Sequence, residues 1–292
     1  MLKNSPVIDL MKSHQVISNN TTISDAIVNI QESSAHCLII TNEKDELAGI
    51  FTEEDIVNKV IDTPLFGEEP ITDFTDPDPL CLNESADFTQ ALDSMGRNNL
   101  RYLPICDQDN KPTGLFTIRE MIYFIASNVE IVENKVVLKK DVPQDIFGKS
   151  HDAILEVLNL PINFAVSSYG SQNIVKLAAQ TLIGDAIGEF KGSGMVAGLV
   201  FNNNKVDGLF RVRDIPFKLL QKNTSVKDLT VSDLVKELPE TIVETDTIGM
   251  GIKNMANNNV LYLHFCPVEG KDGLITARGL LAYMYAHIYD DE

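Results

Sequence analysis

Four short strings of one pattern divide the 292-residue chain into repeats. The first two strings begin 65 positions apart, and the last two are separated by the same 65 positions. A pattern that returns at a fixed spacing indicates several copies of one structural unit, here arranged as two pairs. The chain is therefore interpreted as a duplication of a duplication. The four strings are GIFTEED from Gly49, GLFTIRE from Gly114, GLFRVRD from Gly208 and GLITARG from Gly273.

Each repeat is predicted to form a β-α-β-β-α unit. In the first repeat, residues 15–18 and 37–41 are short runs of strand length, and a third strand is expected to end near Thr52. Between the first two strands, apolar residues recur at helical spacing from Ile23 to Ile30. A unit of about 55 residues buries too little apolar surface to be stable alone. The two units of a pair are therefore expected to pack sheet against sheet.

The segment between the two pairs lacks the repeated pattern and is interpreted as a connector. It contains the string HDAILEVLNL, which predicts a helix with Asp152 as its N-cap. The predicted limits are residues 1–63 for repeat 1, 66–128 for repeat 2, 129–165 for the connector, 166–222 for repeat 3 and 223–290 for repeat 4.

The formal net charge of −18 argues against binding of nucleic acid, which depends on clustered Lys and Arg side chains that neutralise phosphates. An anionic ligand would need a local cluster of positive charge, which makes the positions of the few arginines informative. Four arginines lie in the repeated strings, and the other two lie just before a strand of repeat 2. Arginine forms paired hydrogen bonds with phosphate, so this placement favours an anionic ligand. The alternative is that they are solvated side chains in ion pairs. The six are Arg97, Arg101, Arg119, Arg211, Arg213 and Arg278.

A cytoplasmic protein without a membrane partner is expected. No apolar run approaches the roughly 18 residues of a membrane span, and the first residues lack the apolar region of a secretory signal. Cys37, Cys81, Cys106 and Cys266 lie in apolar runs without metal-like spacing, and are expected to be buried and reduced. No spacing of histidines indicates a metal site, and no serine or cysteine stands in a recognisable nucleophile setting.

The end of each repeated string has two explanations. Thr52 is predicted to be a helix N-cap with Asp55 at the third helical position, a capping box in which each side chain binds a free backbone N–H. The same helix start also favours phosphate, and a nearby carboxylate accepts hydrogen bonds from a ribose diol. Arg211 replaces the threonine in repeat 3, and Gly279 replaces the aspartate in repeat 4. This divergence favours a role in binding, because a purely structural cap should be kept in all four copies.

A strand that ends in Gly-hydrophobic-x-Thr-x-x-Asp, repeated as a pair, resembles the CBS domain family, whose pairs are called Bateman modules. The resemblance covers nearly the whole chain except the connector and is strongest in GIFTEED, GLFTIRE and the preceding RYLPI. It implies an α+β fold of four β-α-β-β-α repeats in two Bateman modules. It also implies an adenosine-containing ligand, such as AMP, ADP, ATP or S-adenosylmethionine, in clefts between paired repeats, with no metal required. The four-unit arrangement is similar to the gamma regulatory subunit of AMP-activated protein kinase.

The resemblance also implies the binding residues. Thr52 with Asp55 is the best-formed site and Thr117 with Glu120 the next, although Glu120 departs from the usual aspartate. Each repeat of the second pair keeps half of a site. His36 aligns with Arg101 and is a candidate for the first cleft, and apolar strand residues are candidates for an adenine slot. The predicted nucleotide-binding residues are Thr52, Asp55, Ile17, His36, Leu38, Arg101, Thr117, Glu120, Leu82, Arg211, Asp214, Thr276 and Arg278.

The leading hypothesis is a non-catalytic regulatory module that binds an adenine nucleotide, chiefly in the first pair, and transmits occupancy to a partner. The partner is expected to be a separate regulated protein or a second copy in a homodimer, unless the two pairs form a disk within one chain. The alternative is a protein-interaction scaffold with degenerate, empty clefts. A third reading, an enzyme with an unrecognised site, has no support from any catalytic constellation.

Overall fold

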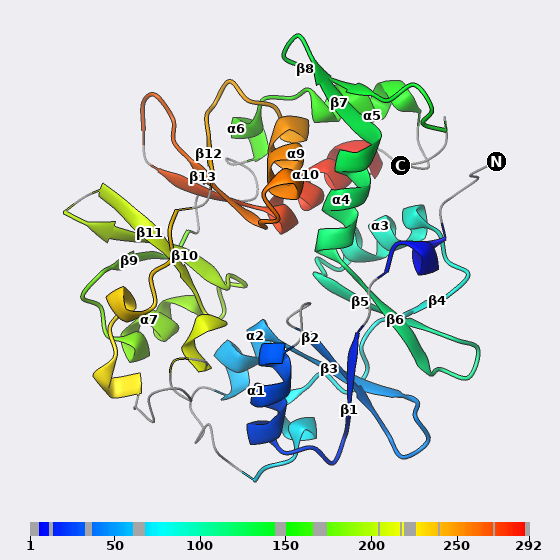
Figure 1. The fold of residues 1–292 in the computed structure, drawn as a ribbon, viewed down its shortest axis with the longest axis vertical. Helices are drawn as coiled ribbons and strands as arrows, with labels where there is room; N and C mark the ends of the chain where they lie inside the picture. Colours follow the sequence, from blue (N-terminus) through cyan, green and yellow to red (C-terminus); the bar gives the residue numbers. More distant parts are fainter. Residues whose placement is uncertain are drawn as a thin grey trace.

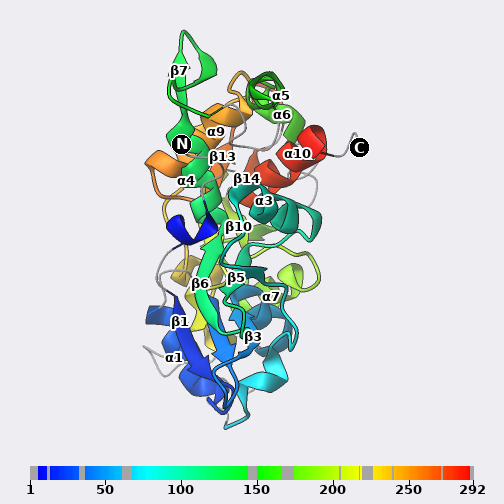
Figure 2. The same cartoon turned by 90° about the vertical axis from the view of Figure 1, so that its right-hand side faces the viewer.

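The structure is a computed structural model of the 292-residue chain. It describes residues 6–11, 14–32, 37–60, 68–143, 150–165, 174–203, 205–216, 218, 226–238, 240–270 and 272–289. Four repeated units surround a common centre in Figure 1, and the assembly is narrower when turned on its edge in Figure 2.

Each unit is built on a three-stranded sheet with one topology. In repeat 1, β1 pairs in parallel with β2, and β2 pairs antiparallel with β3, in the order β1-β2-β3. The other three sheets have the same order and the same directions. The predicted strands at residues 15–18 and 37–41 and the strand ending at Thr52 are confirmed.

The first pair contains these elements. Repeat 1 has β1 (Gln15–Ser18), α1 (Ile23–Glu32), β2 (Cys37–Thr41), β3 (Leu47–Thr52), α2 (Glu53–Asp55) and the π-helix η2 (Ile56–Val60). Repeat 2 has β4 (Leu82–Asn83), α3 (Phe88–Arg97), β5 (Tyr102–Cys106), β6 (Pro112–Thr117) and α4 (Ile118–Asn128). The last helix of repeat 1 thus changes from α to π after one turn, whereas α4 is regular.

The second pair and the connector contain the remaining elements. Repeat 3 has β9 (Lys176–Ala178), α7 (Ile183–Phe190), β10 (Ala197–Asn202) and β11 (Lys205–Arg211). Repeat 4 has β12 (Thr241–Ile242), α9 (Ile248–Asn257), β13 (Tyr262–Phe265), β14 (Gly273–Thr276) and α10 (Ala277–Tyr289). The connector has β7 (Val129–Val132), β8 (Lys135–Leu138), α5 (His151–Leu158) and α6 (Ile162–Ala165).

The connector differs from the prediction in two ways. It begins with an antiparallel hairpin, β7-β8, which the sequence analysis did not foresee. Helix α5 is present, but its N-cap is Ser150 rather than Asp152, because the Ser150 hydroxyl accepts a hydrogen bond from the Ala153 N–H at 3.3 Å. Asp152 lies in the first turn instead, where a carboxylate interacts favourably with the helix dipole.

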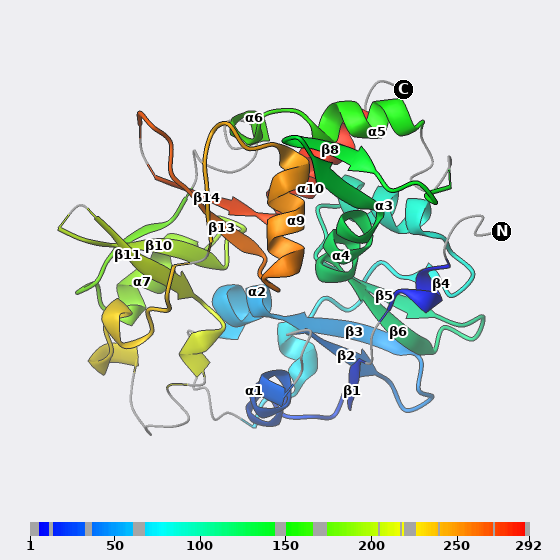
Figure 3. The same cartoon turned by 45° about the horizontal axis from the view of Figure 1, so that its top comes forward.

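Apolar cores join the repeats in two directions. The sheets of repeats 1 and 2 meet through Cys37, Ile39 and Leu115, and those of repeats 3 and 4 meet through a second cluster that includes Leu199 and Leu274. The helices of repeats 2 and 4 share one larger core, in which α4 lies beside α9 and α3 packs against α10 (Figure 3). The expected packing of sheet against sheet within each pair is therefore confirmed, and helix packing joins the two pairs.

Each repeat is completed by a short segment that precedes its partner repeat in the chain. The Ile23 N–H at the start of α1 donates to the carbonyl of Glu69, and the Ile183 N–H at the start of α7 donates to that of Leu229, both at 2.9 Å. In repeats 2 and 4 the exchanged segment is the donor instead. The Val7 N–H donates to the carbonyl of Ala86, and the Ile162 N–H donates to that of Asp246, both at 2.9 Å. These segments carry the 3-10 helices η1 (Val7–Asp9), η3 (Ile71–Phe74), η5 (Val226–Asp228) and η6 (Val231–Asp233), and in one case α6.

The glycine of the repeated string lies against these exchanged segments. A Cβ atom at Gly208 would lie 2.4 Å from the carbonyl oxygen of Lys236, and one at Gly49 would lie 3.0 Å from that of Asp76. At Gly114 a Cβ would overlap Met11. The repeated glycine is thus required by the close backbone approach of the exchanged segment at Gly208, fits tightly against it at Gly49, and faces the flexible Met11 side chain at Gly114.

Two of the four cysteines fit the expectation of burial. All four are free, and Cys37 and Cys106 are buried, with burial raising the pKa of the Cys37 thiol well above its usual value. Cys81 is only partly buried and Cys266 is exposed. The expectation of burial was wrong for Cys266 because it follows the last residue of β13, beyond the part of the strand that faces the core.

We predict that Gly208→Ala lowers the free energy of unfolding by about 1–3 kcal/mol, because the new methyl group forces the segment of Lys236 away from β11. Gly188→Ala in α7 is the matched control, since a Cβ there meets no atom within 4 Å. This control should raise stability by roughly 0.5–1 kcal/mol. Denaturant unfolding of both variants measures the difference, and equal stabilities would contradict the packing argument.

Candidate anion-binding site

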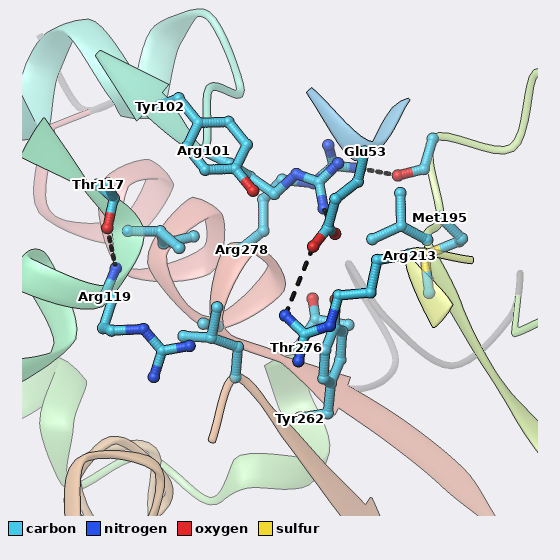
Figure 4. Close-up of a pocket in the computed structure, with 15 residues that line it drawn as sticks. Glu53, Arg101, Tyr102, Thr117, Arg119, Met195, Arg213, Tyr262, Thr276 and Arg278 are labelled. Atoms are coloured by element: carbon cyan, nitrogen blue, oxygen red, sulfur yellow. Dashed lines mark hydrogen bonds and ion pairs between the residues drawn. The ribbon is translucent and has the colours of Figure 1, made fainter. Parts of the chain in front are cut away.

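The ends of the third strands point toward the centre of the assembly. There the chain passes from strand to helix, and Arg119, Arg213 and Arg278 each lie two residues after the last residue of the third strand in repeats 2, 3 and 4. A cavity that is partly open to solvent lies between these helix starts (Figure 4). It is lined by Glu53, Arg101, Tyr102, Thr117, Ile118, Arg119, Gly194, Met195, Val196, Arg213, Leu261, Tyr262, Thr276, Ala277 and Arg278.

All four repeats contribute to this cavity, and its charged side chains come from different repeats. Four of the six arginines line it, two from repeat 2 and one each from repeats 3 and 4. The only acidic residue among the described lining residues is Glu53 of repeat 1. The clustering of arginines predicted from the sequence therefore occurs, but at one centre shared by both pairs.

Two adjacent glutamates of repeat 1 form ion pairs with the central arginines. The Glu54 carboxylate accepts hydrogen bonds from Arg101 at 2.6 Å and from Arg278 at 3.0 Å. Glu53 lies 3.4 Å from Arg213 and 3.9 Å from Arg101. The Glu53 side chain is only 6% exposed and that of Arg101 12%. Arg101 is therefore a shared partner of both carboxylates in a largely dry setting.

Burial and charge change the pKa values around this centre. Burial lowers the pKa of Arg101, but its interactions with Tyr102, Glu54 and other neighbours outweigh that effect and hold the pKa above its usual value. The pKa of Arg278 is lowered by burial and by the like charge of Arg101. Burial also raises the pKa of Tyr102 and Tyr262, and the Glu53 carboxylate adds to the shift. The tyrosines thus remain neutral while the arginines supply the positive charge.

The capping boxes predicted in the first pair are present. The Asp55 carboxylate accepts from the Thr52 N–H and hydroxyl, both at 2.8 Å, and also binds Lys59 at 2.8 Å. The Glu120 carboxylate accepts from the Thr117 N–H at 3.1 Å and from its hydroxyl. In this structure both acidic side chains are committed to local hydrogen bonds, so a ribose diol would compete with them.

The half-sites of the second pair are also closed by local contacts. Arg211 binds Asp214 through two hydrogen bonds, of 2.7 Å and 3.0 Å, so the replacement of threonine by arginine occupies the carboxylate. In repeat 4 the Thr276 hydroxyl accepts from the Gly279 N–H at 3.0 Å and caps α10. Thr276 nevertheless lines the central cavity.

The structure brings four of the predicted binding residues to the cavity, namely Arg101, Thr117, Thr276 and Arg278. The apolar candidates of the first repeat do not line it. Ile17 and Leu38 are buried in the core of repeat 1, and Leu82 packs at the edge of the core of repeat 2. His36 lies outside the described residues. The central residues Glu53, Glu54, Arg119 and Arg213 were absent from the predicted set, although alignment of the four strings already placed Glu54 opposite three arginines.

Comparison with known sequences and structures identifies the class of protein. The sequence model of the CBS domain family matches residues 7–62 and 71–127. The structure of protein MJ1225 from Methanocaldococcus jannaschii has the same fold, with a TM-score of 0.74 at 18% identity over 96% of this chain and 99% of that one. The fold is thus that of two Bateman modules. Both repeats of the first pair in this chain are therefore CBS domains.

Curated relatives are longer than this chain or similar to only part of it. CBS domain-containing protein CBSCBSPB1 of Arabidopsis thaliana is 23% identical over 275 residues, which cover 88% of this chain and 48% of the relative. Inosine-5'-monophosphate dehydrogenase of M. jannaschii is 27% identical over 113 residues, 39% of this chain and 22% of the relative. The chain therefore spans about half the length of the Arabidopsis relative.

Two further features bear on the kind of site. Within the described part of the chain, no group of three or more His, Cys, Asp and Glu side chains is placed to hold a metal ion. The described helices also include none that is both long and apolar enough to cross a membrane.

We predict that Arg101→Met lowers the free energy of unfolding by about 3 kcal/mol, because it removes one partner of a buried ion pair and leaves Glu53 poorly compensated. Arg97→Met is the control, since the Arg97 side chain is 67% exposed and binds Asp93 at the surface. Its effect on the free energy of unfolding should be much smaller than that of Arg101→Met, because solvent screens the exposed ion pair. Urea unfolding compares the two variants, and an equally small loss in both would show that the central ion pairs contribute nothing.

Proposed function

We propose that this chain is a non-catalytic regulatory module that binds an adenosine-containing nucleotide with its phosphates at the central arginines. Occupancy is transmitted to a separate protein or to a second copy of the chain. The observation that carries the proposal is the convergence of four arginines, from three repeats, on one cavity in a protein of net charge −18. A protein so acidic overall has little reason to concentrate its arginines unless they bind negative charge.

The lining suits a nucleotide in two respects. Guanidinium groups bind phosphate through paired hydrogen bonds, and here they approach from several sides of one cavity. Tyr102, Tyr262 and Leu261 add flat or apolar surface of the kind that lines ligand pockets. S-adenosylmethionine carries no phosphate, so the arginines favour AMP, ADP or ATP over it.

The comparisons support a regulatory role. Protein MJ1225 is described as a candidate archaeal homologue of g-AMPK, and this chain shares its fold over nearly its full length. Transmission of a signal requires that the ligand bind one arrangement of the repeats better than another. A cavity lined by all four repeats meets this requirement, because any change in their relative positions moves the arginines apart or together.

A second candidate function is supported by the closed half-sites. The bidentate pair of Arg211 and Asp214 fills the position at which repeat 3 would hold a ribose, and the carboxylates of both capping boxes of the first pair are hydrogen-bonded locally. These contacts favour a protein-interaction scaffold whose clefts between paired repeats stay empty. The two functions differ in whether the central cavity binds a nucleotide.

Thermal unfolding of the purified chain with AMP, ADP, ATP and S-adenosylmethionine separates the two functions. A nucleotide at about 100 times its dissociation constant should stabilise the protein by roughly 2.7 kcal/mol and raise the midpoint by several degrees. Arg213→Gln removes a cavity arginine and should weaken binding by at least about tenfold. Arg97→Gln, with the same change in charge at an exposed position, should leave the shift intact.

Three results would contradict the proposal. If no nucleotide raises the midpoint of the nucleotide-free protein, the scaffold function replaces the sensor. An equal shift in wild type and Arg213→Gln would place the ligand elsewhere. Conversion of a nucleotide to a product would show that the chain is an enzyme.

A further inference from the structure

Repeat 1 carries a carboxylate where the other three repeats carry a guanidinium. Glu54 is the second residue after the end of the third strand of repeat 1. The equivalent residues of repeats 2, 3 and 4 are Arg119, Arg213 and Arg278. Because the four units share one topology, the corresponding helix starts face the same centre (Figure 1). Repeat 1 therefore presents carboxylates to the centre where the other three repeats present guanidinium groups, and Glu53 is the carboxylate that lines the cavity.

The two adjacent carboxylates of repeat 1 contact arginines of all three other repeats. Glu54 binds Arg101 of repeat 2 and Arg278 of repeat 4. Glu53 binds Arg213 of repeat 3 (Figure 4). These are charge-assisted hydrogen bonds of the kind that arginine also makes with a phosphate oxygen. Two carboxylates thus occupy donor groups that an anionic ligand would need.

We propose that Glu53 and Glu54 are a built-in competitor of the anionic ligand and set its minimum charge. This inference rests on the proposed function, because it concerns the same cavity. Arg101 contacts both carboxylates, so a ligand that takes over Arg101 must displace both glutamates together. A single phosphate group can replace one carboxylate, whereas a chain of phosphates can satisfy the guanidinium groups that both carboxylates release. The cavity therefore selects polyphosphates over monophosphates.

Displacement also provides a conformational signal. The two glutamates tie α2 of repeat 1 to the other three repeats through ion pairs between residues up to 224 positions apart. A polyphosphate that replaces them draws repeats 2, 3 and 4 together around the ligand and releases repeat 1. Rejection of a wrong ligand by an unfavourable charge is a known source of specificity in binding sites.

The test measures binding of inorganic tripolyphosphate and inorganic phosphate to the full chain by isothermal titration calorimetry. Glu54→Gln removes the charge and keeps the shape of the side chain, so it should bind tripolyphosphate at least about tenfold more tightly than wild type. The ratio of its dissociation constant for phosphate to that for tripolyphosphate should be smaller than in wild type. Glu43→Gln, an exposed change of the same charge, should match wild type.

Each outcome decides between the competitor and the proposed function. Equal or weaker binding by Glu54→Gln, with wild type still binding, would overturn the competitor and leave the anion site standing. Tighter binding by Glu43→Gln to the same degree would also overturn it, because the effect would then come from net charge. If neither wild type nor Glu54→Gln binds any phosphate compound or nucleotide, the proposed function fails as well. Glu53→Gln gives the same comparison should Glu54→Gln not fold.

Discussion

Each repeat is too small to bury its own core, and the segment that completes it comes from elsewhere in the pair. The helix of repeat 1 begins with a hydrogen bond to Glu69, and the helix of repeat 3 begins with one to Leu229. The glycine of the repeated string keeps the third strand clear for this segment. Pairs are therefore the folding units, since a single repeat would expose the surface that its neighbour's segment covers.

This pairing determines where the chemistry occurs. Packing of the sheets within pairs and of the helices of repeats 2 and 4 directs the ends of the third strands to one centre. The four copies share one backbone topology but differ in their charged residues. Arginines and carboxylates from distant parts of the sequence therefore meet at this centre. In the central ion pairs Arg101 is shared by Glu53 and Glu54. The packing that buries the cores of the repeats thereby creates a cavity that all four repeats line.

Much of the repeat could be predicted from the sequence, because its causes are local. Short apolar runs indicated the strands, apolar residues at helical spacing indicated α1, and the Thr-x-x-Asp spacing indicated the capping box at Thr52. The exchanged segments and the β7-β8 hairpin could not be predicted, since they depend on contacts between units. The same reason applies to the role of Glu54, whose partner Arg278 is 224 positions away. Ile17 and Leu38 lie in the core of repeat 1, and their role in an adenine slot stays a prediction, because strand residues of a core and of a slot look alike in sequence.

The most direct test of a central anion site is a crystal structure of the chain with ATP. The account predicts density for the phosphates within hydrogen-bonding distance of Arg101, Arg213 and Arg278, with the Glu54 carboxylate moved away from the arginines that it now contacts. Phosphates bound only at the capping boxes of the first pair would contradict the account. So would a complex in which Glu54 remains bound to Arg101 and Arg278 as it is here.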